Sequence, residues 1–206
     1  MSRYRDADCK ICRRSRVKLF LKGDKCYSDK CPILKRNTPP GHRVSMGRRL
    51  SEYGIRLREK QKLRFFYGVT ETQMRNYFKK AVNQKGIAGY NLLKLFELRL
   101  DNVIYRMGMA ESRKKARQMA QHNFVTLNDT KVNIPSILVK EGDVLKMKKS
   151  DKGFVKERLE GLKNYEFPAW IEYNAQKQEF KILQVPEYEE IDAPVDVQLI
   201  VEYYSR

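Results

Sequence analysis

Four cysteines within the first 31 residues restrict how this part of the chain can fold. Cys9 and Cys12 form a CxxC pair, and after 13 intervening residues Cys26 begins a second short pair that ends at Cys31. Zinc takes four ligands in a tetrahedron, and two short thiolate pairs joined by a longer loop supply that geometry. We therefore predict one structural Zn²⁺ ion bound by Cys9, Cys12, Cys26 and Cys31, with no ligand position left for catalysis.

Free thiols and a redox CxxC are the alternatives to zinc, and the redox motif would need a thioredoxin-like βαβ setting that the sequence lacks. The segment has many cations and few large apolar residues, so it cannot bury enough surface to order itself without a metal. Metal binding would then fix the cations of this segment in place for a polyanion. They are Lys10, Arg13, Arg14, Arg16, Lys18 and Lys22.

Charge is distributed unevenly along the 206 residues, whose formal net charge is +18. Residues 1–64 hold 20 Lys or Arg and 6 Asp or Glu, whereas residues 167–206 hold 3 and 8. A basic front of this kind attracts RNA, DNA or an anionic membrane, and solubility alone does not call for such clustering. No apolar run of about 18 residues and no signal peptide is present, so we expect a cytoplasmic protein.

The chain divides into successive patterns. Residues 1–45 end in a Pro39-Pro40-Gly41 break that a helix cannot cross. Residues 46–95 combine an apolar face with a strongly basic one, which indicates amphipathic helices, the second of them capped by Thr70 or Thr72. In and just before this region we predict that seven cations contact RNA, namely Arg43, Arg48, Arg49, Arg56, Lys60, Lys62 and Arg64.

A second pattern follows at residues 93–107, where apolar residues recur every three or four positions and predict one helical face that ends at Gly108. Ser112 begins the next predicted helix, and a β-hairpin turns at Asn128-Asp129. The remaining predicted elements are strands at 124–127, 132–134, 144–147, 170–173 and 179–182 and a helix at 153–162. The apolar stretch 197–204 fits a helix or a strand equally well.

The helix that begins at Ser112 is the clearest candidate for RNA contact outside the cysteine segment. Arg113 and Arg117 are four residues apart and share a face, and a helix N-terminus offers free N–H groups to a phosphate. The alternative is an ordinary solvated basic face. The predicted RNA-binding residues here are Ser112, Arg113, Lys114, Arg117 and Gln118, with Lys131 and Asn133 in the hairpin.

Two sets of segments resemble a known family. LRLDNVIYRMG, ESRKKARQMAQHNFV, LNDTKVNIPS and GDVLKM, between Leu98 and Met147, resemble the RNA-binding module first named for bacterial small-subunit ribosomal protein four. LSEYGIRLREKQKLRFFYGV, the PPG at 39–41 and the final LIVEYYSR resemble the rest of that protein family, and CKICRRSRVKLFLKGDKCYSDKC resembles its zinc-binding four-cysteine variant. The sequence departs from the family at His42-Arg43-Val44 and in its opening residues.

The resemblance implies an α+β fold. Family members have a mainly helical lobe, with an inserted small α/β RNA-binding module of two helices packed on a short antiparallel sheet and an N-terminal zinc-clipped segment. Carried to this chain, the domains are the zinc-binding basic N-terminal segment 1–45, the helical domain 46–95 completed by 179–206, and the inserted module 96–178.

The function that the resemblance implies is that of a structural protein of the small ribosomal subunit. Such a protein binds 16S rRNA at a multi-helix junction of the 5′ domain and nucleates subunit assembly. It also lines the path by which mRNA enters and contributes to translational accuracy with ribosomal protein five. The acidic, apolar-tipped tail suits a protein partner better than RNA, and its predicted protein contacts are Val201, Tyr203 and Tyr204.

Three other functions are alternatives to this one. An RNA-modifying enzyme that carries this module would need a catalytic domain, for which the assigned segments leave no room, so we expect no enzyme activity. A zinc-finger DNA-binding regulator would place a recognition helix just after its zinc ligands, where Pro32, Pro39 and Pro40 oppose one. A zinc-containing RNA-binding regulator and the RNA-binding part of an RNA-modifying enzyme stay open as alternatives.

Overall fold

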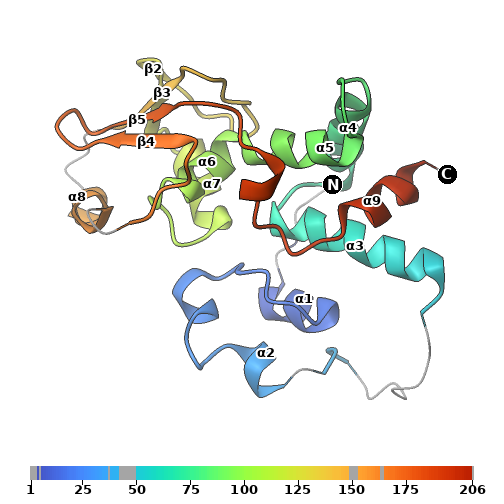
Figure 1. The fold of residues 1–206 in the computed structure, drawn as a ribbon. Coiled ribbons are helices and arrows are strands. Elements are labelled where there is room, and N and C mark those ends of the chain that lie inside the picture. The colour runs from blue at the N-terminus through green and yellow to red at the C-terminus, as the bar shows by residue number, and fades with distance from the viewer. Residues whose placement is uncertain are drawn as a thin grey trace. The chain divides into compact units, whose positions relative to one another are not determined.

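The computed structural model describes residues 4, 6–36, 38–41, 50–148, 153–162 and 165–205. Its contacts divide the chain into two compact units (Figure 1). Unit 1 comprises Met1–Leu92 and Asp192–Arg206, and unit 2 comprises Leu93–Ile191. The predicted RNA-binding residues Arg43, Arg48 and Arg49 lie outside the described residues, as does the His42-Arg43-Val44 departure.

Unit 1 begins with the cysteine-bearing segment, which folds into short helical turns. These are α1 (Asp8–Ser15), the 3-10 helix η1 (Gly23–Cys26) and α2 (Pro32–Lys35). Helix α1 ends where Arg16 adopts a left-handed conformation (φ 57°) and its N–H donates to the Cys12 carbonyl, a usual way to close a helix. The described part of the Pro-Pro-Gly break is not helical, as its sequence predicted.

The rest of unit 1 is helical, which confirms the prediction for its described residues. Helix α3 (Glu52–Phe66) begins at Ser51, whose hydroxyl accepts from the Gly54 N–H, and α4 (Glu71–Val82) begins with a capping box between Thr70 and Gln73. Helix α5 (Ala88–Glu97) follows and continues into unit 2. The side chains that bury the apolar faces include Leu63, Phe66, Met74, Phe78, Ala81 and Leu92.

The last helix of unit 1, α9 (Val197–Tyr204), settles the conformation that the sequence left undecided. The Asp196 carboxylate accepts hydrogen bonds from the Gln198 and Leu199 N–H groups, so it caps the first turn. Helix α9 packs along α3 and buries Val197 and Ile200. A strand would have lacked this cap and this partner.

Unit 2 packs two helices beside one antiparallel sheet. The helices are α6 (Leu100–Arg106) and α7 (Arg113–Gln121), and the sheet has the order β2-β1-β3-β5-β4. Its strands are β1 (Val125–Leu127), β2 (Thr130–Lys131), β3 (Val144–Met147), β4 (Ile171–Asn174) and β5 (Glu179–Ile182).

One core joins the helices and the sheet of unit 2. Ile104 of α6, Ala116 of α7, Leu145 of β3 and Phe180 of β5 all have no exposed surface. Leu145 and Phe180 are direct neighbours across the ladder between β3 and β5. The predicted helix at 153–162 is present as α8 (Gly153–Gly161), and the 3-10 helix η3 (Tyr188–Glu190) follows the sheet.

The prediction of one continuous helix over 93–107 is wrong. The apolar residues at that spacing are all buried, but the chain breaks between α5 and α6, where Arg99 is extended and forms an isolated bridge with Leu138. The Leu100 N–H donates to the Ile137 carbonyl at 2.8 Å, and the Val139 N–H donates to the Leu98 carbonyl at 2.8 Å. These contacts with a distant loop replace the intrahelical bonds at this point.

Two other boundaries differ from the sequence prediction. The hairpin turns at Asn128-Asp129 as predicted, with φ of 48° and 61°, but its second strand covers Thr130–Lys131 and not 132–134. Strand β5 pairs with β3 and β4, so residues 179–191 belong to unit 2, whereas the sequence assigned them to the helical domain. Among the described residues, no helix is long and apolar enough to cross a membrane.

Candidate nucleic-acid interface and cysteine cluster

The four cysteines are brought close together in unit 1. All four are free thiols; Cys9 is half-buried, and Cys12, Cys26 and Cys31 are buried. Burial is the largest cause that raises the pKa of the Cys12 thiol to about 11; a hydrogen bond from the Leu19 backbone opposes it, and the other three cysteines add to it. The thiols are therefore near enough to interact electrostatically.

Backbone donors also point at these sulfur atoms. The Lys22 N–H donates to Cys26 Sγ at 3.4 Å. Burial raises the pKa of Cys26, while hydrogen bonds from the Lys22 and Leu21 backbones lower it, as donors to a sulfur favour its thiolate form. Backbone N–H donors to sulfur and several neighbouring thiols are features typical of a metal centre with thiolate ligands. Within the described residues, however, no three Cys, His, Asp or Glu side chains are already arranged to hold a metal ion.

The cations around the cysteines are mostly at the surface of the segment. Lys10, Arg14, Arg16 and Lys22 are exposed, as expected for side chains that contact a polyanion. The other two predicted residues are half-buried, and Arg13 Nε donates to the Thr38 carbonyl at 2.9 Å. Lys18 is the second of these half-buried cations.

The predicted RNA-binding cations of α3 are paired with carboxylates inside unit 1. Arg56 Nε lies 2.8 Å from Glu202 Oε2, and Lys60 Nζ lies 2.8 Å from Glu71 Oε1. Arg64 approaches the second Glu71 oxygen at 3.7 Å. In the same way Lys62 pairs with Glu59. These charges are already compensated within the chain, and their contact with RNA stays a prediction.

The predicted protein-contact residues lie on α9, and two of them are engaged inside unit 1. The Tyr204 ring stacks on Phe78 with 4.7 Å between centroids, and its hydroxyl donates to Glu71 Oε1 at 3.1 Å. Burial and the adjacent Glu71 carboxylate raise the pKa of Tyr204. Val201 lies against α5, because a Cβ added to Gly89 would be 3.3 Å from its Cγ2.

Tyr203, the third of these residues, borders a shallow pocket of about 330 Å³ on unit 1. Its ring lies 5.8 Å from the ring of Tyr53, and Lys60 Nζ lies 4.9 Å from its centroid. One guanidinium nitrogen of Arg56, NH1, is buried there without a hydrogen-bond partner among the described residues. Aromatic rings beside an arginine are the composition typical of a protein-binding hot spot. The pocket is lined by Tyr53, Arg56, Arg75, Tyr203 and Tyr204.

In unit 2, the predicted RNA-binding helix α7 has its expected cap. The Ser112 hydroxyl accepts from the Lys115 N–H at 3.3 Å. Arg113 Nε donates to Asn102 Oδ1 at 2.8 Å, and its guanidinium lies over the Tyr105 ring at 4.5 Å. Arg117 NH1 donates to Asp101 Oδ2 at 2.9 Å. Both arginines are thus held by α6.

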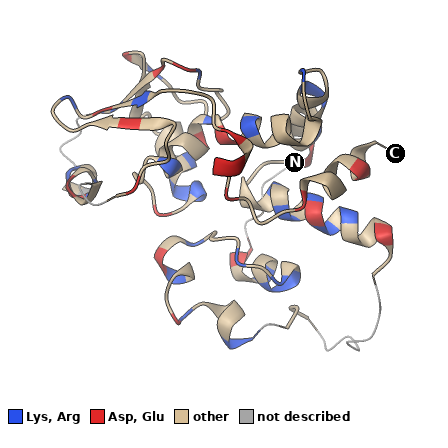
Figure 2. Ribbon diagram, viewed as in Figure 1, with Lys and Arg blue, Asp and Glu red and all other residues tan. Residues whose placement is uncertain are grey.

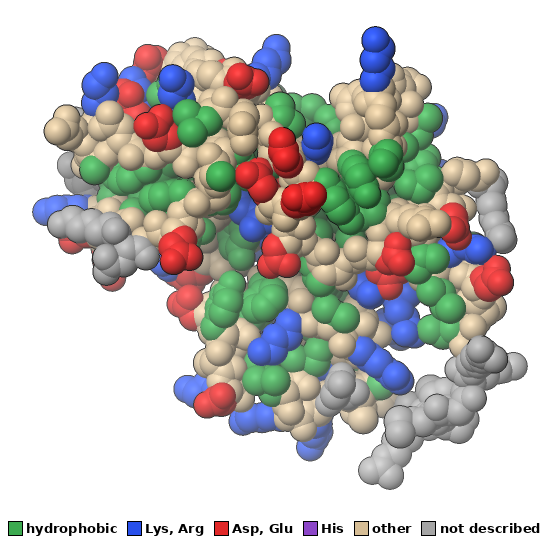
Figure 3. Space-filling view, viewed as in Figure 1, with side chains coloured by type: hydrophobic (Ala, Val, Ile, Leu, Met, Phe, Trp, Pro, Cys, Tyr) green, Lys and Arg blue, Asp and Glu red, His purple; other side chains and the backbone are tan. Residues whose placement is uncertain are grey.

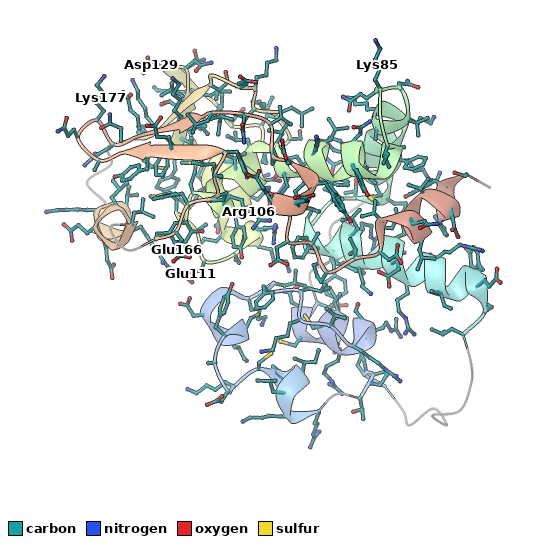
Figure 4. The ribbon with its side chains drawn as sticks, in the orientation of Figure 1. Lys85, Arg106, Glu111, Asp129, Glu166 and Lys177 are labelled. Carbon is teal, nitrogen blue, oxygen red and sulfur yellow. The ribbon has the colours of Figure 1, made fainter. Side chains whose placement is uncertain are left out.

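The other predicted contacts of unit 2 reach solvent. Lys114 and Gln118 are exposed and, being four residues apart, lie on one face of α7. Lys131 and Asn133 are exposed on and just after β2. Helix α7 is also tied to α8, since Glu111 pairs with both Lys115 and Arg158 (Figure 4). The predicted RNA-binding surface of unit 2 is therefore exposed in part: its lysines and amides reach solvent, whereas Arg113 and Arg117 are half-buried and held by α6.

Sequence reasoning missed the buried ionic network that fixes those arginines. Arg99 has no exposed surface, and its guanidinium binds Asp101 twice, with Nε to Oδ1 at 3.0 Å and NH2 to Oδ2 at 2.7 Å. Glu97 receives two bonds from Arg106, each of 2.9 Å, and a third from Asn102 Nδ2 at 2.7 Å. Opposite charges at alternating positions inside an apolar stretch were the available signal.

Comparison with known proteins covers the whole chain. Residues 3–97 match the family described as ribosomal protein S4/S9 N-terminal domain, and residues 98–145 match the S4 domain. The chain is 49% identical over 208 residues to small ribosomal subunit protein uS4 of Thermodesulfovibrio yellowstonii, with all of both chains covered. It is 49% identical over 207 residues to the protein of that name from Clostridioides difficile, again over all of both chains.

Proposed function

Given that this chain belongs to the uS4 family of bacterial small ribosomal subunit proteins, we propose that it binds 16S rRNA at a multi-helix junction of the 5′ domain and nucleates subunit assembly. Its role is structural and rRNA-binding, it is not an enzyme, and it is bound to the ribosome in the cytoplasm. The observation that carries the proposal is the family match, which spans the cysteine segment, the helices and the S4 domain in one chain.

Exposed cations in both units support direct RNA binding. The cysteine segment offers Arg14 and Arg16, and unit 2 offers Lys114 and Lys131. Helical RNA is recognised largely by its shape, through phosphates and 2′-hydroxyl groups, so such a protein needs cations held in place and no catalytic centre. The hydrogen bonds from Arg113 to Asn102 and from Arg117 to Asp101 hold the cations of α7 in fixed positions, as this mode of binding requires.

A filter-binding competition tests this proposal. The purified full-length chain is mixed with a transcript of the 5′ domain of 16S rRNA and then with duplex DNA of equal length as competitor. We expect the duplex to compete more weakly by a factor on the order of 10³, as non-specific ligands commonly do. Equal competition by the two nucleic acids would contradict the proposal.

We further propose that one zinc ion cross-links the cysteine segment. The burial of Cys12, Cys26 and Cys31, the amide donors to sulfur and the proximity of the four thiols support it. When bound, zinc supplies a structural link that stabilises a segment poor in apolar residues.

Metal analysis and hydrogen exchange test the zinc proposal together. The full-length chain should contain one zinc per molecule, and Cys12→Ser should lose it and raise exchange in residues 6–36. Ser28→Ala alters the same segment without removing a thiol and should leave both measurements unchanged. A metal-free wild-type chain, or one whose exchange is unaffected by a chelator, would count against zinc.

We also propose that ribosomal protein five binds at the pocket between α3 and α9. The path by which mRNA enters would then lie nearby. The exposed rim residue Tyr53, whose ring lies 5.8 Å from that of Tyr203, supports a protein contact there, which the resemblance links to translational accuracy. Calorimetric titration with purified protein five should show weaker binding for Tyr53→Ala. Tyr27→Ala, at another exposed tyrosine of unit 1, should bind as wild type. The reverse order would contradict this assignment.

A further inference from the structure

The stretch from Thr72 to Phe96 contains no acidic residue, although it holds Arg75, Lys79, Lys80, Lys85 and Lys94. Helices α1 and α3 of unit 1 mix both signs, as α3 does with Glu52 and Glu59 among its cations. In Figure 2, blue marks the later part of α4 and the loop that follows it. A stretch of one sign in an otherwise mixed helical region calls for a partner of the opposite sign.

The structure places the central cations of this stretch on a single outer face. Helix α4 buries Met74, Tyr77, Phe78 and Ala81. Lys79 and Lys80 are exposed on the side opposite these residues, given 100° of rotation per helical position. Lys85 follows three residues beyond the end of the helix, and Figure 4 shows it projecting from the tip of the α4–α5 connection. We call Lys79, Lys80 and Lys85 the α4 face.

The α4 face differs from α3 in having no internal compensation. Every predicted cation of α3 pairs with a carboxylate of unit 1. By contrast, within the described part of the chain no hydrogen bond or ion pair involves the side-chain ammonium group of Lys79, Lys80 or Lys85, and the one specific side-chain contact is Lys80 Nζ at 6.0 Å from the Tyr77 ring. The space-filling view shows a basic side chain standing clear of the surface in this region (Figure 3).

Neutral polar groups accompany the cations. Asn76 and Asn83 lie on the same exposed side of α4 or at its end, and Gln84 follows them. Amide side chains both donate and accept hydrogen bonds, which suits the 2′-hydroxyl of RNA, whereas phosphates are met by the lysines. The combination therefore fits a sugar–phosphate backbone better than it fits a protein carboxylate cluster.

Helix electrostatics alone does not account for this arrangement. Lysines in the last turn interact favourably with the C-terminal end of a helix dipole, which covers Lys79 and Lys80. Lys85 lies beyond that turn, and the dipole gives no reason to exclude Asp and Glu from residues 72–96. An external polyanion accounts for both features.

We propose that the α4 face binds the sugar–phosphate backbone of rRNA, as an RNA contact of unit 1 distinct from the cysteine segment and from the cations of α3. This inference rests on the proposed binding of 16S rRNA. It shifts the main RNA contact of the helical part from α3, where the charges are paired internally, to α4.

The experiment compares three full-length proteins on a transcript of the 16S 5′ domain by filter binding over a range of KCl. They are the wild type, K79A/K80A/K85A, and the matched control K140A/K177A/K181A, which removes three exposed cations from unit 2. The α4 variant should bind at least tenfold more weakly at moderate salt. Its log–log salt slope should be shallower by about 2, since each phosphate contact contributes about 0.7 to 0.9.

The control variant should keep nearly wild-type affinity, and K79R/K80R/K85R should retain the affinity that the alanine variant loses. Equal losses in the alanine variant and its control would show an effect of net charge and overturn the proposal. Wild-type affinity and slope in the alanine variant would also overturn it. Absence of binding by the wild-type chain would instead refute the proposed rRNA binding on which the inference depends.

Lysine acetylation of the wild-type complex provides a readout that does not depend on the folding of a variant. Bound RNA should protect Lys79, Lys80 and Lys85 from an amine-reactive reagent, while Lys177, on the turn between β4 and β5, should react as in the free chain (Figure 4). Unprotected lysines on the α4 face within a complex that has formed would overturn the proposal.

Discussion

Arg99 illustrates how single residues of this chain combine stability with function. Its guanidinium is fully buried, and Asp101 neutralises it while also accepting a hydrogen bond from Arg117 of α7. A buried charge is tolerated only when it is paired and hydrogen-bonded, because its desolvation is costly. The carboxylate of Asp101 therefore fixes α6 and the predicted RNA-binding helix in one arrangement.

Replacing Asp101 by Asn should destabilise unit 2 strongly. The change leaves the buried charge of Arg99 uncompensated, and breaking such a pair costs about 3–5 kcal/mol in the free energy of unfolding. Trp170, the single tryptophan, is 2% exposed in the core of unit 2, so its fluorescence during urea unfolding reports on this unit. Asp129→Asn, at an exposed ion pair with Lys146, serves as the control and should leave the midpoint nearly unchanged. Similar midpoints for the two variants would disprove the role of the network.

Glu71 should make the stability of unit 1 depend on acid pH. Burial raises its pKa, but the hydrogen bond and charge of Lys60, the Tyr204 hydroxyl and the charge of Arg64 together lower it below the ordinary 4.5. A depressed folded-state pKa gives a contribution that is present above pH 4.5 and is lost as the pH falls through the folded-state value. The difference in unfolding midpoint between wild type and Glu71→Gln, followed by circular dichroism, should therefore shrink on acidification.

The matched variant for this measurement is Glu52→Gln, which removes a carboxylate whose side chain is 80% exposed. It should lower the midpoint little at any pH, because exposed ion pairs contribute little to stability. A pH-independent difference between wild type and Glu71→Gln would show that the stabilising role assigned to this carboxylate is wrong.

At the scale of elements, helical periodicity predicted most of what the structure contains. The amphipathic patterns of α3 and α4 and the helical cap at Ser112 are present because side-chain burial and capping act over one or two turns. The break at Arg99 escaped prediction because it depends on bridging to Leu138, some forty positions away. Helix α9 was not predicted because its eight largely apolar residues fit a helix or a strand equally well, and only the structure shows that Asp196 caps the helix.

The contact between α5 and α9 depends on Gly89. A Cβ at this position would lie 2.3 Å from Val197 Cγ1, which is closer than packed atoms approach. Gly89→Ala should therefore lower the free energy of unfolding by about 1–3 kcal/mol, despite the better helix propensity of alanine, because the packed interface must shift. Adding Val197→Ala should recover part of that loss. Thermal unfolding followed by circular dichroism measures both changes.

The double-mutant cycle gives this prediction its control. Gly54→Ala, in α3 of the same unit, would place its Cβ 3.4 Å from Ser51 Oγ, an ordinary contact distance, and should not be destabilising. Strictly additive effects of Gly89→Ala and Val197→Ala would mean that the close approach between α5 and α9 is not what the alanine disturbs.

At the scale of the whole molecule, sequence identified which residues carry charge but not which charges are compensated. Arg56 and Glu202, which pair at 2.8 Å, are 146 positions apart, so no local pattern could join them. The acidic end of unit 2, with η3 red in Figure 2, was visible in the sequence as a reversal of net charge. Residue types and spacing thus located the basic regions, whereas tertiary pairing determined which cations remain available.

Cations occur at the surface of both compact units, so rRNA should bind the chain as two linked modules. Arg14→Ala with Arg16→Ala in unit 1 and Lys114→Ala with Lys131→Ala in unit 2 should each weaken filter binding to the 5′-domain transcript and reduce its salt slope. If the two units contribute independently, the combined variant should lose affinity by about the sum of the two free-energy changes. If one double variant binds like the wild type, the other unit alone carries recognition. A combined loss well above the sum would contradict this independence and show that each unit compensates for loss of the other, because a tethered second contact keeps the local concentration of RNA high.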